Sequence, residues 1–141
     1  MKDRFLIFAV SALIILWVYT AGSKVLEFHE FKHQLKLQHF NNTVIPLLSV
    51  ILPLSEALTA FLLSRSVSRI PGLYYSLLLL AVFTIYIILI LIGFFDKVPC
   101  SCGGVLKEMS WKTHLLFNAS FLSLNLWAVY YIKQKERRPG K

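Results

Sequence analysis

Long uncharged stretches alternate with short charged ones along the chain. Four of these stretches are 18 to 23 residues long and almost wholly apolar, close to the ~20 residues with which a helix crosses a bilayer. Trp and Tyr residues lie near several of their ends, as expected at the headgroup level. We therefore predict an all-α fold, a four-helix transmembrane bundle in one domain, 1–141. Its spans are expected at about 5–22, 44–63, 73–95 and 115–132, followed by a basic cytoplasmic tail, 133–141.

The segment between the first two spans has a helical pattern of its own. Apolar residues recur there at helical spacing, namely Val25, Phe28, Phe31 and Leu35. Lys and His residues lie between them, which predicts an amphipathic helix on the membrane surface. His29 and His33 are four residues apart and could hold a metal. Because no third ligand is evident beside them, we favour histidines at the headgroup level.

Composition and charge agree with a membrane protein. Apolar residues make up 57% of the chain, charged residues only 16%, and the mean hydropathy is +0.65. A soluble domain is typically ~45–50% apolar, so this chain lacks the polar surface that water requires. The net charge of +8 comes from basic residues that flank the spans, as topology alone requires. We expect a lipid bilayer as partner and no nucleic acid.

The basic residues also predict an orientation. We place both termini on one side, together with the connection between the second and third spans. That side then has nine of the fifteen Lys and Arg residues: Lys2, Arg4, Arg65, Arg69, Lys133, Lys135, Arg137, Arg138 and Lys141. The other side receives six, diluted by acidic residues: Lys24, Lys32, Lys36, Lys97, Lys107 and Lys112. Basic residues favour the cytoplasmic side, so we predict that both termini are cytoplasmic.

The connection before the fourth span carries both cysteines of the chain, in the sequence Pro99-Cys100-Ser101-Cys102-Gly103-Gly104. The predicted orientation places it outside, where disulfides persist. A disulfide across one residue would be strained, and strained exposed disulfides are easily exchanged. Two alternatives stay open, namely ordinary or passive loop thiols and a metal site with His114 as third ligand. A closed zinc site, however, normally has four ligands.

Three polar residues of the fourth span share one helical face. His114, Asn118 and Asn125 follow each other at offsets of four and seven. Polar residues in a span usually face the other helices and hydrogen-bond across them. We expect that role for the two asparagines. For His114, at the outer end of the span, an acid–base role beside the cysteines is an equal alternative.

Glu56 is an ionisable residue inside the second span, three residues after Pro53. A carboxyl group at that depth is costly and is treated as a functional-site hypothesis. Proton handling and bundle assembly are equal alternatives for it. In the second case we expect a protonated carboxyl that bonds to residues such as Asn118, Asn125 or Ser55.

These features resemble the MauE family, a branch of the DoxX-like membrane proteins. The resemblance covers nearly the whole chain and rests on Gly22-Ser23-Lys24, on Phe28 and Phe31, on Pro53 with Glu56, on Pro99–Gly104, and on Trp111, His114 and Asn118 downstream. It implies a bacterial inner-membrane protein with a redox-associated role. In that family, MauE is tied to methylamine utilisation and to the maturation of a disulfide-rich periplasmic protein beside a thioredoxin-like partner.

We therefore expect a thiol–disulfide redox protein that supports oxidation or maturation of an extracytoplasmic partner. Its site residues would be Cys100, Cys102, His114 and Glu56, with no resident metal. Alternatives are a quinone-coupled thiol oxidase like the DsbB and VKOR groups, with a quinone as cofactor, and a non-enzymatic scaffold or metal-binding subunit. Those oxidases normally use a second cysteine pair, so here a partner would have to supply the other dithiol.

Overall fold

The computed structural model describes residues 2–38, 40–94 and 110–137. These residues form five helices and no strand: α1 (Lys2–Leu26), α2 (Phe28–Leu37), α3 (Ile45–Ser64), α4 (Arg69–Leu91) and α5 (Trp111–Arg137). The predicted all-α fold is therefore confirmed.

Four of the helices, α1, α3, α4 and α5, are long and apolar enough to cross a membrane. Their outward faces carry large apolar side chains, such as Ile15, Leu54 and Leu78, which are 57–68% exposed. Exposed apolar surface on every long helix is what a bundle in lipid presents. The four predicted spans thus correspond to four helices, and the chain is a multi-pass membrane protein.

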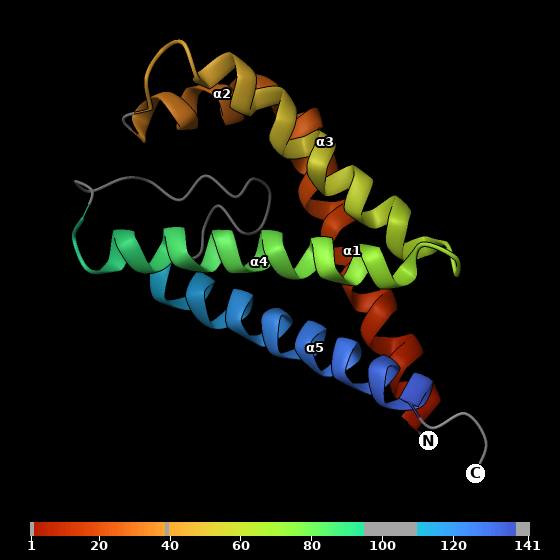
Figure 1. The fold of residues 1–141 in the computed structure, drawn as a ribbon. Helices are drawn as coiled ribbons and strands as arrows, with labels where there is room; N and C mark the ends of the chain where they lie inside the picture. Colours follow the sequence, from red (N-terminus) through yellow and green to blue (C-terminus); the bar gives the residue numbers. More distant parts are fainter. Residues whose placement is uncertain (1, 39, 95–109, 138–141) are drawn as a thin grey trace.

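The helices pack as two pairs, α1 with α3 and α4 with α5 (Figure 1). The main core lies where the pairs meet and contains Leu13, Trp17, Leu63, Leu73 and Leu80, all nearly inaccessible. This core holds the two pairs together in the half of the bundle nearer the termini.

Both ends of the chain lie at the same end of the bundle (Figure 1). Lys135 Nζ lies 2.8 Å from Asp3 Oδ1, and the Tyr131 hydroxyl donates to the same oxygen at 3.2 Å. At the opposite end lie α2, the C-termini of α1 and α4, and the first turn of α5. We call this opposite end the α2 end.

The third span ends earlier than predicted. α4 begins at Arg69 and ends at Leu91, whereas the expected span was 73–95. Gly93 has φ +77°, its N–H donates to the Ile90 carbonyl, and the Phe94 N–H donates to the Leu89 carbonyl. This is a Schellman motif, which needs the left-handed conformation that glycine adopts easily. The predicted span extended to 95 because Phe94 is apolar, and hydropathy alone does not show where a helix ends.

The first span, in contrast, extends further than predicted. α1 continues past Gly22 to Leu26, so Lys24 and Val25 belong to it rather than to the following amphipathic helix. That helix is present as α2, which begins at Phe28 after a turn at Glu27. Phe31 and Leu35 of α2 are buried against Ile45 at the start of α3, with Leu48 and Leu52 beside them.

The four residues expected on one amphipathic face therefore do not share it. Val25 is 62% exposed on α1 and Phe28 is 41% exposed, while Phe31 and Leu35 are buried. The turn at Glu27 changes the direction of the chain, which breaks the periodicity on which the prediction relied.

At the other terminus, α5 continues to Arg137, so the basic tail begins as helix.

Candidate functional site

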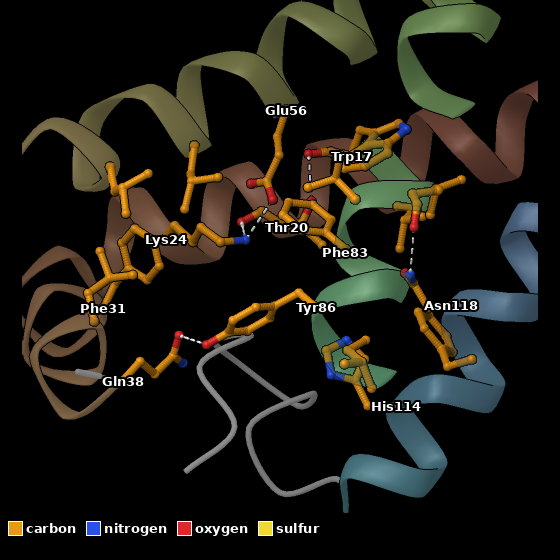
Figure 2. Close-up of a pocket in the computed structure, with 18 of the residues that line it drawn as sticks. Trp17, Thr20, Lys24, Phe31, Gln38, Glu56, Phe83, Tyr86, His114 and Asn118 are labelled. Atoms are coloured by element: carbon orange, nitrogen blue, oxygen red, sulfur yellow. Dashed lines mark hydrogen bonds and ion pairs between the residues drawn. The ribbon is translucent and has the colours of Figure 1, made fainter. Parts of the chain in front are cut away.

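A cavity of about 240 Å³ lies between the two helix pairs, towards the α2 end (Figure 2). All five helices contribute to its lining. Seven of its twenty lining residues are aromatic: Trp17, Phe31, Phe40, Phe83, Tyr86, Trp111 and Phe117. In the whole chain only 14% of residues are aromatic, so rings are concentrated at this site.

Two oppositely charged side chains meet at the cavity. Lys24 on α1 and Glu56 on α3 point toward one another in Figure 2, with Nζ 2.7 Å from Oε1. Their side chains are only 9% and 1% exposed. A buried pair in such geometry is held by Coulomb attraction and a charge-assisted hydrogen bond, which offset part of the cost of desolvation.

Sequence reasoning missed the position of Lys24, which was counted among the basic residues of the outer connection. Side chains of a helix point back towards its N-terminus. The Lys24 stem therefore extends into the bundle, where Nζ also donates to the Thr20 carbonyl at 3.4 Å and lies 5.7 Å from the ring centroid of Phe31. A buried carboxylate requires a partner, and this requirement of Glu56 was the signal in the sequence that could have identified Lys24 as a buried residue.

Glu56 is placed one turn after Pro53 on the buried face of α3. The partners expected from the sequence are wrong: Asn118 and Asn125 bond to α4, and Ser55 Oγ donates to the Leu52 carbonyl at 2.8 Å. One carboxylate oxygen of Glu56, Oε2, has no hydrogen-bond partner within the described ranges. The cavity therefore contains an unsatisfied acceptor.

The polar face of α5 points into the bundle. His114, Asn118 and Asn125 are all buried. Asn118 Nδ2 donates to the Leu80 carbonyl at 3.1 Å and to Thr84 Oγ1 at 2.7 Å. The prediction that the asparagines join helices is therefore confirmed for Asn118.

Asn125 makes the second such link. In the amide orientation that satisfies both of its ends, Oδ1 accepts from Ser76 Oγ at 2.8 Å and Nδ2 donates to the Leu73 carbonyl at 3.3 Å. Ser76 Oγ in turn accepts from Trp17 Nε1 at 2.8 Å. This chain of bonds connects α1, α4 and α5 and confirms the same role for Asn125.

His114 lies in the first turn of α5 and lines the cavity. It is 7% exposed, and its ring stacks on Trp111 with centroids 6.1 Å apart. Cys100 and Cys102, with which it was expected to act, lie outside the described residues. His114 and Tyr86 therefore both line the cavity (Figure 2).

A link between α2 and α4 was not foreseen from the sequence. The Tyr86 hydroxyl donates to Gln38 Oε1 at 2.6 Å, and the Tyr86 ring stacks on Phe40 with centroids 6.3 Å apart. Gln38 follows the last turn of α2. Since Tyr86 and Gln38 are 48 positions apart, only packing brings them together.

The metal alternatives gain no support from the described part of the chain. His29 and His33 are exposed on α2. Within residues 2–38, 40–94 and 110–137, no three His, Cys, Asp or Glu side chains gather as a metal site would require. A site that includes the two cysteines falls outside these ranges.

The cavity thus combines aromatic walls, a buried ion pair with one carboxylate oxygen that no described residue bonds, and a buried imidazole. A family model described as "Methylamine utilisation protein MauE" matches residues 2–131, which include α1 to α4 and most of α5. Comparisons with curated proteins and with solved structures gave no match. Because the match covers nearly the whole chain, this multi-pass membrane protein belongs to the MauE family.

Proposed function

We propose that the protein is a thiol–disulfide redox protein of the bacterial inner membrane, which supports oxidation or maturation of an extracytoplasmic partner. The observation that carries the proposal is the position of His114. This buried imidazole lies at the α2 end, where α4 ends and α5 begins, and the segment between them contains both cysteines.

Chain connectivity keeps the thiols within range of that end. Cys100 follows Phe94 by six residues, and Cys102 precedes Ser110 by eight. An extended chain covers at most ~3.6 Å per residue, so Cys100 lies within ~22 Å of Phe94 and Cys102 lies within ~29 Å of Ser110. These distances support an encounter of the thiols with His114.

The exchange requires a second dithiol, because the chain has only two cysteines. A thiolate of the partner attacks the Cys100–Cys102 disulfide, and a mixed disulfide forms as one sulfur leaves as a thiolate. The second partner thiol then resolves it. The partner is left with a disulfide and this chain with two thiols, so two electrons and two protons have moved. His114 would take up a proton, and Glu56 would serve as an internal proton site.

Trapping the mixed disulfide tests the proposal. Cys100→Ser and Cys102→Ser are each expressed in the native host, cells are quenched with acid, and captured proteins are identified by mass spectrometry. We expect at least one single variant to hold an extracytoplasmic, thioredoxin-like or disulfide-containing partner that dithiothreitol releases. The cysteine-free double variant is the control.

The opposite result is equally clear. If both thiols of the wild-type protein form no disulfide under oxidising conditions and instead hold stoichiometric metal, the redox proposal is wrong. The family description names methylamine utilisation, and the identity of the trapped partner tests whether that pathway applies to this chain.

A further inference from the structure

The walls of the cavity favour a flat, apolar ligand. Aromatic rings come from α1, α2, α4 and α5, and Leu48 and Leu52 of α3 complete the lining. Aromatic side chains pack against ring ligands in stacked or edge-to-face contacts. The volume of about 240 Å³ exceeds the ~150 Å³ of an apolar protein cavity that binds benzene. A single six-membered ring with small substituents therefore fits.

The polar end of the cavity selects among such ligands. The Lys24 ammonium is a donor, and Glu56 Oε2 is a buried acceptor without a partner in the described part of the chain. The pair as a whole has no net charge, so an anionic or cationic headgroup would leave one charge uncompensated. A neutral group that can accept a hydrogen bond in one state and donate one in another matches both atoms.

We propose that this cavity binds the headgroup of a lipophilic quinone, with one ring oxygen at the Lys24–Glu56 pair. The quinone carbonyl would accept from Lys24 Nζ, and the quinol hydroxyl would donate to Glu56 Oε2. The exposed apolar side chains around the bundle indicate that it lies in the bilayer, where the isoprenoid tail would reside. Binding itself does not require the cysteines.

A redox role of the bound quinone rests on the proposed function, in which the quinone would be the electron acceptor. The Cys100 and Cys102 dithiol, reduced by the partner, would give two electrons and two protons to the quinone. Two S–H bonds break, one S–S bond forms, and both ring oxygens become hydroxyls. Lys24 Nζ, which donates to the nearer oxygen, would pass it a proton, and a proton released by the thiols would restore the ammonium group.

Photoaffinity labelling tests the binding. The purified wild-type protein in phospholipid nanodiscs is irradiated with an azido-ubiquinone analogue, with and without excess decylubiquinone, and labelled peptides are mapped. We expect competed labelling of cavity residues such as Thr20 and Tyr86, and only uncompeted labelling of lipid-facing residues such as Ile15 and Leu78. Because this measurement uses the wild-type chain, it does not depend on how variants fold.

Two matched variants sharpen the test. Leu52→Trp fills the cavity one turn before Glu56, whereas Leu54→Trp adds the same ring to a position that is 62% exposed on the same helix. Leu52→Trp should require about tenfold more decylubiquinone for competition, equivalent to ~1.4 kcal/mol, and Leu54→Trp should match the wild type. Equal competition in both variants, or labelling that decylubiquinone does not displace, overturns the proposal and indicates partition into lipid only.

The cysteine-free variant separates the two proposals. If Cys100→Ser/Cys102→Ser is labelled as the wild type is, quinone binding stands whether or not thiol exchange occurs. If a single Cys→Ser variant traps a partner by mixed disulfide but the wild type shows no competed labelling, the exchange stands and the quinone proposal fails.

Discussion

The ammonium group of Lys24 lies 2.7 Å from the carboxylate of Glu56 inside the bundle, although 32 residues separate them. The contact joins the C-terminal turns of α1 to the middle of α3 and leaves neither charge in lipid. Breaking a buried pair costs more than replacing both members, because a single change leaves one charge without a partner.

The first prediction concerns this pair. Lys24→Met should lower the free energy of unfolding by about 3–5 kcal/mol, the usual cost of a buried charge left without a partner. The double variant Lys24→Met/Glu56→Leu should recover most of that loss. Thermal unfolding in detergent, followed by size-exclusion chromatography, measures both. A double variant as unstable as Lys24→Met would show that the buried charge is not the cause.

The second prediction uses Glu56 alone. Glu56→Gln should preserve membrane insertion, because the amide oxygen can still accept from Lys24 Nζ, but it should lower the free energy of unfolding because the ammonium group loses its counter-charge. Glu56→Lys should impair insertion by placing two ammonium groups side by side. Membrane-fraction yields and partner oxidation are the measurements. Equal yield and activity for the wild type and both variants would make Glu56 a bystander.

The third prediction concerns the close approach of α3 and α4. A Cβ atom on Gly72 would lie 3.0 Å from the backbone carbon and Cβ of Leu62 and from the nitrogen of Leu63. Gly72→Ala should therefore destabilise the protein by about 1–3 kcal/mol, as overpacking does. Gly22→Ala is the matched control, since beyond the adjoining backbone of its own helix no described atom lies within 4 Å of its Cβ position. It should be neutral or stabilising, because alanine favours helix, and equal melting shifts for both would contradict the packing argument.

The fourth prediction is the orientation. The Asp3–Lys135 contact places both termini at one end of the bundle, and the nine-to-six division of basic residues predicts that this end is cytoplasmic. Reporter fusions at Lys141 and Gly104 should report the cytoplasmic and the extracytoplasmic side, respectively. A periplasmic signal at Lys141 would reverse the orientation and remove the compartment argument for disulfides.

The fifth prediction isolates His114. His114→Gln should slow thiol exchange by about 10²-fold, the lower end of what a positioned acid–base group contributes, while leaving the mixed disulfide trappable. Stopped-flow reaction with a disulfide reagent over a pH series measures the rate and its pH profile. Lys112→Gln, an exposed change two residues away, is the control. An unchanged rate and profile in His114→Gln would make His114 a packing residue.

The sequence by itself determined the four long helices, α2, the shared end of the termini and the inward face of α5. These features depend on local properties. The length of an apolar run matches the bilayer, and residues at offsets of four and seven share a helical face wherever the helix packs. Asn118 and Asn125 could therefore be assigned to helix contacts before their partners were known.

Only the tertiary structure decided what surrounds Glu56. Its partner depends on α1 continuing past Gly22, on the direction in which the Lys24 stem points, and on how α1 and α3 are rotated against each other. None of these is encoded in the hydropathy of a single segment. The cavity has the same origin, because its lining residues come from five helices and extend from Leu16 to Asn118 along the sequence. Such a site exists only once side-chain packing has fixed which faces meet.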